Sequence, residues 1–355
     1  MFFALISNMF CNLYMEVLPI ISGRVAKEMC SDIFVSGRTP EDIAKHETSI
    51  FPYNLASYSV NIEDSSVSVS VLGFAKRRAI YRDGLGATLI SRISENELRR
   101  QSLNIISRTS AYQDSTPFPQ GDLIDDKKPK GVDTAVLESA INYAFHEPHN
   151  ENQRQTRAVI VVYMGKVIAE RYADGYSIKS KQLGWSMTKG IINAMIGILV
   201  QQGKLNINSP APIEEWKNDE RKKITIANLM HMDSGLQFWW FPAGPSDLTN
   251  MLFKEGNMSD FAINNKFTAT ASKAVNSSKG GKYGALWWTN EADNNNNNKK
   301  YINVPSDCFS CQGYDGQFVW VIPSKKLVVV RLSFERGDPL DPNILLSQII
   351  EALPE

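Results

Sequence analysis

The sequence is poor in the residue types that build metal centres and disulfide scaffolds. Its 355 residues include only four histidines and four cysteines. Four cysteines in so long a chain cannot form a disulfide-dense fold, and so few histidines argue against a histidine-rich metal centre. The chain has 43% hydrophobic residues, so we expect it to fold around an apolar core, with room for roughly two domains.

An excess of charge of either sign is also lacking. Lysine and arginine together number 38, and aspartate and glutamate together number 38. Nucleic-acid affinity depends largely on positive charges that neutralise phosphates, so this balance argues against a nucleic-acid partner. Polybasic membrane binding and an electrostatic funnel for acidic substrates lose their simplest support for the same reason.

No apolar run approaches the roughly 20 residues that a membrane span needs. The N-terminal residues 1–21 are mostly apolar, but Asn8, Asn12 and Glu16 interrupt them and no lysine or arginine precedes them. A signal peptide normally begins with positive charge. We favour a buried or interfacial helix here. Secretion or membrane association through residues 1–21 remains the alternative, and the compartment stays open.

The first third of the chain has the alternating pattern of short strands. Apolar residues occupy every second position from Tyr58 to Ile62 and again from Val67 to Val71, as half-buried strands require. Residues 115–131 then combine prolines, glycines and charges, a linker composition. We therefore predict a small β-containing leader region over residues 1–125 and a main domain over residues 126–355.

Two hairpins and two helices frame the main domain. The expected elements are a helix over 133–145, a hairpin with strands 158–163 and 167–172, a second hairpin with strands 318–322 and 327–332, and a final helix over 343–353. Hairpins from opposite ends of one region can join into one sheet. This predicts an α/β fold of the α+β type, in which terminal helices flank an antiparallel sheet and the middle of the domain is mainly helical.

One short motif indicates chemistry. Ser186-Met187-Thr188-Lys189 precedes the apolar run of residues 191–202, and Gly203 follows where a left-handed helix cap is expected. The spacing predicts Ser186 at the start of a buried helix, with Lys189 one turn on and on the same face. A lysine deprived of water can lose its charge and accept the serine proton. Alone, the pattern fits a serine cap followed by a solvated lysine equally well.

The order of several segments resembles a known family. These segments are CSDIFVSGR (residues 30–38), the hairpin of residues 158–172, SMTK (186–189), LMHMDSGL (229–236), YGALWW (283–288) and GYDGQ (313–317) with its hairpin. Together they resemble the β-lactamase-related serine hydrolases, which include class C β-lactamases, carboxylesterases and 6-aminohexanoate-dimer hydrolases. The resemblance implies a β-lactamase/transpeptidase-like fold, a small-molecule ester or amide substrate, and no metal or organic cofactor.

The resemblance also assigns roles to residues. Ser186 would be the acylated nucleophile and Lys189 its partner in proton transfer. Residues 313–317 would form the third family motif, in which Tyr314 stands where the family usually has lysine or histidine. Tyr314, Gly316 and Gln317 would then contact the substrate or its oxyanion, and the backbone N–H groups of Gln317 and Ser186 would form the oxyanion hole.

The chain departs from the family where the family has its tyrosine base. No tyrosine occurs between Tyr176 and Tyr283, and after residues 260–266 the chain passes directly to 268–273, which look like material from much later in the family. This indicates a reduced helical lobe. Two readings follow: a serine hydrolase that acts through an acyl-enzyme, and an impaired or inactive relative. The second binds ligands or partners, or is a truncated isoform whose lobe cannot close.

Two weaker signals have simple structural explanations. Cys308 and Cys311 have the spacing of a metal or redox pair, but no second pair accompanies them, so we expect them to fill a strand. His231 could form a dyad with Ser186, yet it lies on a predicted apolar helix over 226–232, and a buried, hydrogen-bonded histidine is the better expectation.

Overall fold

The computed structural model describes residues 16–102, 115–124, 128–148, 153–242, 244–267, 282–292 and 299–354. The chain forms two units. The first comprises Met1–Ser107, Ile213–Asn218 and Leu236–Thr268, and the second comprises Arg108–Pro212, Asp219–Gly235 and Ala269–Glu355. The first unit contains segments from both sides of residue 125. The boundary that the sequence predicts at residue 125 is a statement about composition, and it stays a prediction.

The first unit is built on a four-stranded antiparallel sheet in the order β1-β2-β3-β4. The strands are β1 (Ala56–Asn61), β2 (Ser66–Val71), β3 (Phe74–Arg82) and β4 (Gly86–Leu89). The predicted hairpin is present, with Tyr58 opposite Val69 and Val60 opposite Val67. The inward face comes from β2, whose Val67 and Val69 are buried, whereas Ile62 lies exposed in the turn beyond the edge strand β1.

Helix α2 (Leu18–Phe34) covers this sheet and supplies much of its core. Val25, Ala26 and Met29 pack with Val67 and Val69. The remaining helices of the unit are α3 (Pro40–His46), α4 (Glu95–Arg100), α8 (Asp247–Phe253) and α9 (Met258–Ile263), and α8 packs against α2.

The N-terminal apolar segment is partly accounted for by this core. Leu18 and Ile21 are buried against Val71, as the buried-helix expectation requires, while residues 1–15 lie outside the described residues. Within the part of the chain that the structure describes, no helix combines the length and the apolar character needed to cross a membrane.

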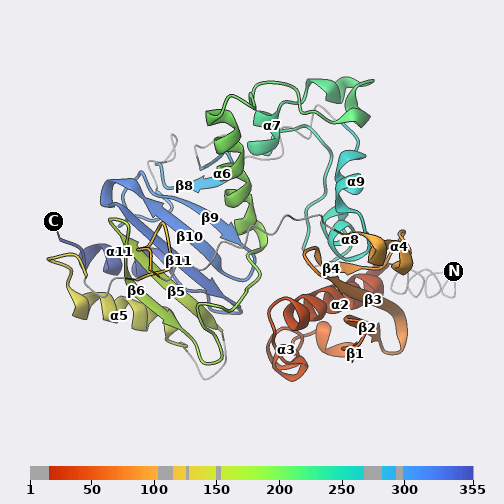
Figure 1. Ribbon diagram of the computed structural model, residues 1–355, viewed down its shortest axis with the longest axis horizontal. Coiled ribbons are helices and arrows are strands. Elements are labelled where there is room, and N and C mark those ends of the chain that lie inside the picture. The colour runs from red at the N-terminus through yellow and green to blue at the C-terminus, as the bar shows by residue number, and fades with distance from the viewer. Residues whose placement is uncertain are drawn as a thin grey trace, which may run out of the picture. The chain divides into compact units, whose positions relative to one another are not determined.

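The second unit contains a seven-stranded antiparallel sheet, which confirms the predicted fold class (Figure 1). Its order is β6-β5-β11-β10-β9-β8-β7. The strands are β5 (Thr156–Tyr163), β6 (Lys166–Tyr172), β7 (Tyr283–Gly284), β8 (Trp287–Thr289), β9 (Phe309–Gly313), β10 (Gln317–Ile322) and β11 (Leu327–Ser333). Strand β11 pairs with β5, so the two predicted hairpins join side by side in one sheet.

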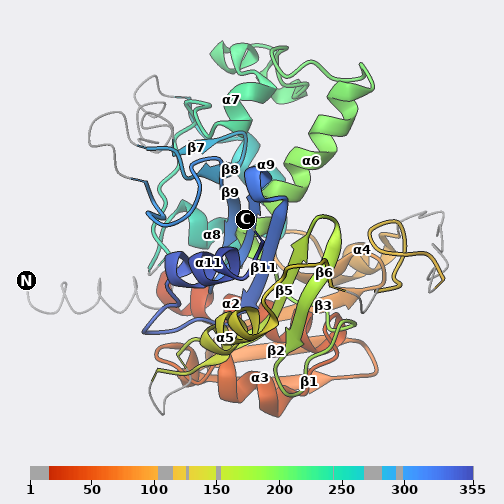
Figure 2. The ribbon, with the colours of Figure 1, turned by 90° about the vertical axis from the view of Figure 1, so that its left-hand side faces the viewer.

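Helices α5 (Thr134–Phe145) and α11 (Pro342–Glu351) lie side by side over one face of this sheet (Figure 2). Leu137 and Ile141 of α5 and Leu346 of α11 join Trp320 and Val329 of the sheet in a single buried cluster. Full burial of each aliphatic side chain contributes about 1.5–3 kcal/mol. The predicted terminal helices are therefore present, and they hold the main core.

The opposite face carries helix α6 (Thr188–Gln201) near β9. Neighbouring residues of a strand point to opposite faces, and Cys308, two residues before Ser310, belongs to the cluster under α5 and α11. Cys311 therefore points the other way, toward Gly190 of α6. Besides α6, the middle part of the second unit has one further described α-helix, α7 (Ile226–Met230), and a short 3-10 helix at Glu220–Lys223. Residues 268–281, which include the stretch expected to follow a deletion, lie outside the described residues.

Candidate functional site

Ser186 lies in a short 3-10 helix, Trp185–Met187, immediately before α6. The residue ahead of it, Trp185, has φ +48°, a left-handed conformation that a bulky side chain adopts only under constraint. Gly184, one position earlier, begins this turn and accepts the Met187 N–H through its carbonyl at 3.0 Å. The result is a serine side chain exposed on a tightly turned segment.

The structure brings Lys189 and Ser186 together. Lys189 Nζ donates to Ser186 Oγ at 2.7 Å, as the spacing of three residues predicts. Burial lowers the pKa of the Lys189 ammonium from its ordinary value. A lowered pKa increases the fraction of neutral amine near neutral pH, and a neutral amine next to a hydroxyl can accept its proton.

The first turn of α6 is fixed against the sheet at Gly190. A Cβ on Gly190 would lie 2.9 Å from Cys311 Sγ and 3.1 Å from Trp287 Cζ2, so at least the Cys311 side chain would have to move. One turn later, the Asn193 side chain donates to Ala285 O at 2.8 Å and accepts from Trp287 Nε1 at 3.1 Å. These contacts hold Lys189, which lies just ahead of Gly190, at a defined place on the sheet.

Beyond Gly190 the helix differs from the expectation. Sequence analysis predicted a buried helix, and this is wrong: Ile191 is 57% exposed, Met195 56% and Ile198 52%. Within the described ranges no neighbouring element covers these side chains, and the sequence pattern could not show this. Gly203 does end the helix as expected, with φ +68°. Loss of water around Lys189 is thus a local effect at the start of α6.

The third motif lies beside the serine segment. A Cβ on Gly313 would overlap the Gly184 carbonyl oxygen, so the end of β9 approaches the serine turn as closely as a backbone allows. The rings of Trp185 and Tyr314 meet edge to face with 5.6 Å between their centroids. Tyr314 is half exposed, and it therefore forms part of the surface next to Ser186.

Gly316 is the last residue of the β9–β10 turn, and Gln317 is the first residue of β10. Gln317 pairs with Gly313 across β9 and β10, and its buried side chain donates to Ser333 O at 2.5 Å. Gly316 has φ +82°. The side chain of Gln317 thus serves the turn, and the proposed role of its backbone N–H in an oxyanion hole stays a prediction.

The remaining sequence candidates have structural roles. His231 Nδ1 lies 2.8 Å from Ala227 O of its own helix. Cys308 and Cys311 are free and buried, and burial raises the pKa of their thiols to about 12 and about 11, which makes them inert. Across the described ranges, no three histidine, cysteine or acidic side chains lie close enough together to hold a metal ion.

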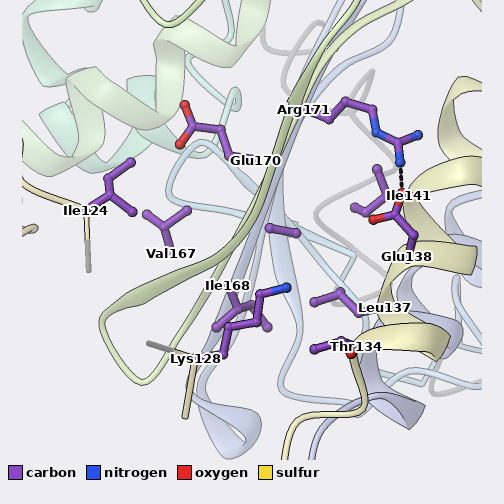
Figure 3. A pocket seen from close by; sticks show the side chains of 11 residues that line it. Ile124, Lys128, Thr134, Leu137, Glu138, Ile141, Val167, Ile168, Glu170 and Arg171 are labelled. Atoms are coloured by element: carbon purple, nitrogen blue, oxygen red, sulfur yellow. Dashed lines mark hydrogen bonds and ion pairs between the residues drawn. The ribbon is translucent and has the colours of Figure 1, made fainter. Parts of the chain in front are cut away.

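A pocket at the other edge of the sheet lies between α5 and β6 (Figure 3). Arg171 on β6 reaches across to Glu138 on α5 and forms an ion pair with it. Apolar side chains of both elements, among them Leu137 and Ile168, complete the wall. None of the predicted site residues lines this pocket.

Sequence reasoning missed the contacts that assemble the site. The positive φ of Trp185 could not be predicted, because no sequence pattern marks a tryptophan with a left-handed backbone conformation. Gly184 and Gly313 are glycines next to the two motifs, and a search for close backbone approach could have marked them. The buried Arg331 and Ser333, which hold the β9–β10 turn, lie in what reads as an ordinary strand.

Comparisons with known proteins agree with these features. The Beta-lactamase family model matches residues 141–261, a region that contains Ser186 and Lys189, whereas the β9–β10 turn lies outside it. A search of curated proteins finds no match.

Solved structures give a more distant likeness. A putative 6-aminohexanoate-dimer hydrolase from Bacillus anthracis is 15% identical, covering 57% of this chain and 81% of its own, with a TM-score of 0.37. A β-lactamase from Mycobacterium bovis is 15% identical over 61% and 100%, with a TM-score of 0.38. EstA from Arthrobacter nitroguajacolicus Rue61a is 10% identical over 62% and 96%, with a TM-score of 0.40. At these identities and TM-scores, the likeness carries no argument about activity.

The match to the family model is independent of that likeness and covers the segment in which serine and lysine meet. It confirms the resemblance first drawn from the order of the motifs. Residues 141–261 of the chain are thus similar to the Beta-lactamase family, of which the β-lactamase-related serine hydrolases are part.

Proposed function

We propose that the protein is a serine hydrolase that cleaves a small-molecule ester or amide through an acyl-enzyme on Ser186. The observation that carries the proposal is the 2.7 Å contact between Lys189 Nζ and Ser186 Oγ. Since burial lowers the pKa of Lys189, its amine accepts the serine proton as the oxygen attacks the carbonyl carbon. The tetrahedral intermediate then collapses, the alcohol or amine leaves with a proton, and water hydrolyses the acyl-enzyme.

The oxyanion needs donors close to Ser186. Ser186 lies two residues before the N-terminus of α6, where the helix dipole favours negative charge, and Gly313 at the end of β9 lies against Gly184. We propose that the backbone N–H groups of Ser186 and Gln317 are the donors. Tyr314 adds a neutral hydroxyl rather than a cation at this edge. We therefore expect neutral esters to react better than substrates that present a carboxylate there.

Hydrolysis of a p-nitrophenyl ester by the wild type and by Ser186→Ala tests the proposal. The wild type should hydrolyse the ester, and the variant should fall to the background rate of the buffer. Ser310→Ala is a matched control, since Ser310 is a buried serine on β9 whose side chain faces α5 and α11. Equal rates for wild type and Ser186→Ala would refute the proposal.

An impaired or inactive relative is the second candidate. Two observations favour it: no tyrosine occurs between Tyr176 and Tyr283, and the apolar residues of α6 are exposed. Proton transfer by a positioned base contributes about 10²- to 10⁴-fold in rate. If only that step is lost, Ser186 still reacts with a fluorophosphonate, while steady-state turnover is slow and an acyl-enzyme accumulates. A burst of p-nitrophenol equal to the enzyme concentration, followed by little turnover, identifies this case.

A further inference from the structure

The turn between β9 and β10 sits against the serine segment and has an unusual backbone. Its three residues are Tyr314, Asp315 and Gly316, and the last two have φ of +61° and +82°. Asp315 is strained in this region, whereas glycine adopts it freely. Since Gly313, at the start of the turn, meets the Gly184 carbonyl directly, a shift of the turn also shifts the walls of the site.

The end of β11 and the residues after it hold the turn from its inner side. Ser333 Oγ lies 2.8 Å from both Asp315 O and Gly316 O, and its single proton is shared between these acceptors. Glu335 N–H donates to Asp315 O at 2.9 Å. The Asp315 carboxylate is buried in an ion pair with Arg336. Every one of these contacts acts on the turn's backbone or its central side chain, and none touches Ser186.

Arg331 completes the arrangement from within the sheet. Its side chain is 0% exposed, and its guanidinium donates to Gly316 O at 3.4 Å, to Glu335 Oε1 at 2.8 Å and to Thr156 Oγ1 at 3.0 Å. A buried charged group adds little net stability compared with an apolar side chain of the same size. The planar guanidinium instead holds several N–H donors in fixed directions, so it can bind several acceptors at defined positions at the same time.

The space beneath the turn is filled. A Cβ on Gly316 would lie 2.9 Å from Arg331 Nη1 and 2.8 Å from Glu335 Oε2, and it would overlap Ser333 Oγ. The α-carbon of Gly316 therefore lies directly against these three side chains, and its carbonyl accepts from Arg331 and Ser333. In this position of the turn, the ring of Tyr314 lies against that of Trp185.

We propose that Arg331 and Ser333 are positioning residues for the Ser186 site: they fix the β9–β10 turn so that its backbone and Tyr314 face the carbonyl under attack. This inference rests on the proposed function. It makes the turn a rigid wall whose placement is set from β11, far along the chain from the serine. Misplacement by about 1 Å can cost up to about 10²-fold in rate.

Ser333→Ala is the sharpest test, because it removes one hydroxyl and leaves the other contacts of the turn in place. We expect kcat for a p-nitrophenyl ester to fall about 10-fold or more with KM little changed, and hydrogen exchange of the amides of residues 314–317 to accelerate. Arg331→Lys keeps the charge and loses the fork of donors, and we expect the same pattern. Ser310→Ala is the matched control and should leave both kcat and the exchange of these amides unchanged.

Two results overturn the inference, and they can be told apart. If the wild type shows Ser186-dependent turnover but Ser333→Ala leaves kcat and amide exchange unchanged, the positioning role is wrong and the proposed function stands. If the wild type shows no Ser186-dependent turnover, the proposed function fails, and the positioning role fails with it. Should Arg331→Lys not fold, Ser333→Ala alone still decides between these outcomes.

Discussion

The two faces of the seven-stranded sheet differ in how far they are covered. Under α5 and α11, Leu137, Ile141 and Leu346 are buried with the sheet residues in one cluster. On the other face, the first turns of α6 are anchored at Gly190 and Asn193, whereas Ile191, Met195 and Ile198 are exposed. One face of the sheet is covered by a buried apolar cluster. The other face carries α6, whose apolar side chains are exposed.

We infer that the two faces of the sheet have different roles: the covered face stabilises the fold, and the other face carries the proposed reaction. The covered face contains a large cluster of buried apolar side chains, and burial of apolar surface is the main favourable term in folding. The open face carries Ser186 and the half-buried Lys189, the two residues that we propose carry the reaction. We therefore expect substitutions on the two faces to affect different measurements.

The largest effect belongs to the open face. Lys189→Met should lower kcat/KM for an ester about 10²- to 10⁴-fold, because the serine loses the group that accepts its proton. The same variant should leave the melting temperature unchanged or raise it, since a desolvated amine is replaced by an apolar side chain of similar length. The exposed Lys204, just beyond α6, provides the control: Lys204→Met should change neither value.

On the covered face, stability should respond. Leu346→Ala removes a fully buried side chain and should lower the free energy of unfolding by about 2–5 kcal/mol. On the open face, Ile198→Ala should change it by about 0.5 kcal/mol or less. Urea denaturation followed by circular dichroism measures both. Similar losses for the two variants would mean that α6 is covered in solution, and the comparison would fail.

A pair of glycines on α6 sharpens the comparison within one helix. Gly190→Ala pushes a methyl group into Cys311 and Trp287 and should destabilise the protein by about 1–3 kcal/mol while slowing ester hydrolysis. Gly197 has nothing within 4 Å of its Cβ position, so Gly197→Ala should stabilise the helix by up to about 1 kcal/mol. Thermal melts of the two variants should therefore shift in opposite directions.

The smallest effect is in the pH dependence of stability. The pKa of Lys189 is lower in the folded protein than its ordinary value of 10.5, so the unfolded chain binds more protons between these two pKa values. Stability contributed by this group therefore rises with pH across that interval. Comparing the pH profiles of wild type and Lys189→Met isolates the contribution. A contribution that falls with rising pH would contradict the assigned direction.

Much of the covered face could be predicted from the sequence, because its elements have strong local patterns. The helix at 134–145, both hairpins and the final helix lie within one or two residues of their predicted bounds. Periodicity could not show that α6 is exposed. An apolar helix pattern states what a helix could bury and says nothing of whether a neighbour is present to cover it.

Part of the site was also predictable, because it depends on a local pattern. Ser186 and Lys189 are three residues apart in a helical stretch, and such a spacing fixes their contact locally. Gly184 and Gly313, which lie against each other, are more than a hundred positions apart in the chain. Arg331, which supports the turn, is buried within a strand. Contacts of that kind depend on strand order and register, which the hairpins alone did not specify.

The central claim is that the Lys189 amine activates the Ser186 hydroxyl. The most direct measurement is the rate at which a fluorophosphonate adds to Ser186, followed by intact mass against pH in the wild type and in Lys189→Met. We predict a single adduct, absent from Ser186→Ala, whose rate of formation rises with pH and levels off below 10.5, and a Lys189→Met variant that reacts far more slowly. A wild type that forms no adduct, or equal rates with and without the lysine, would contradict the account.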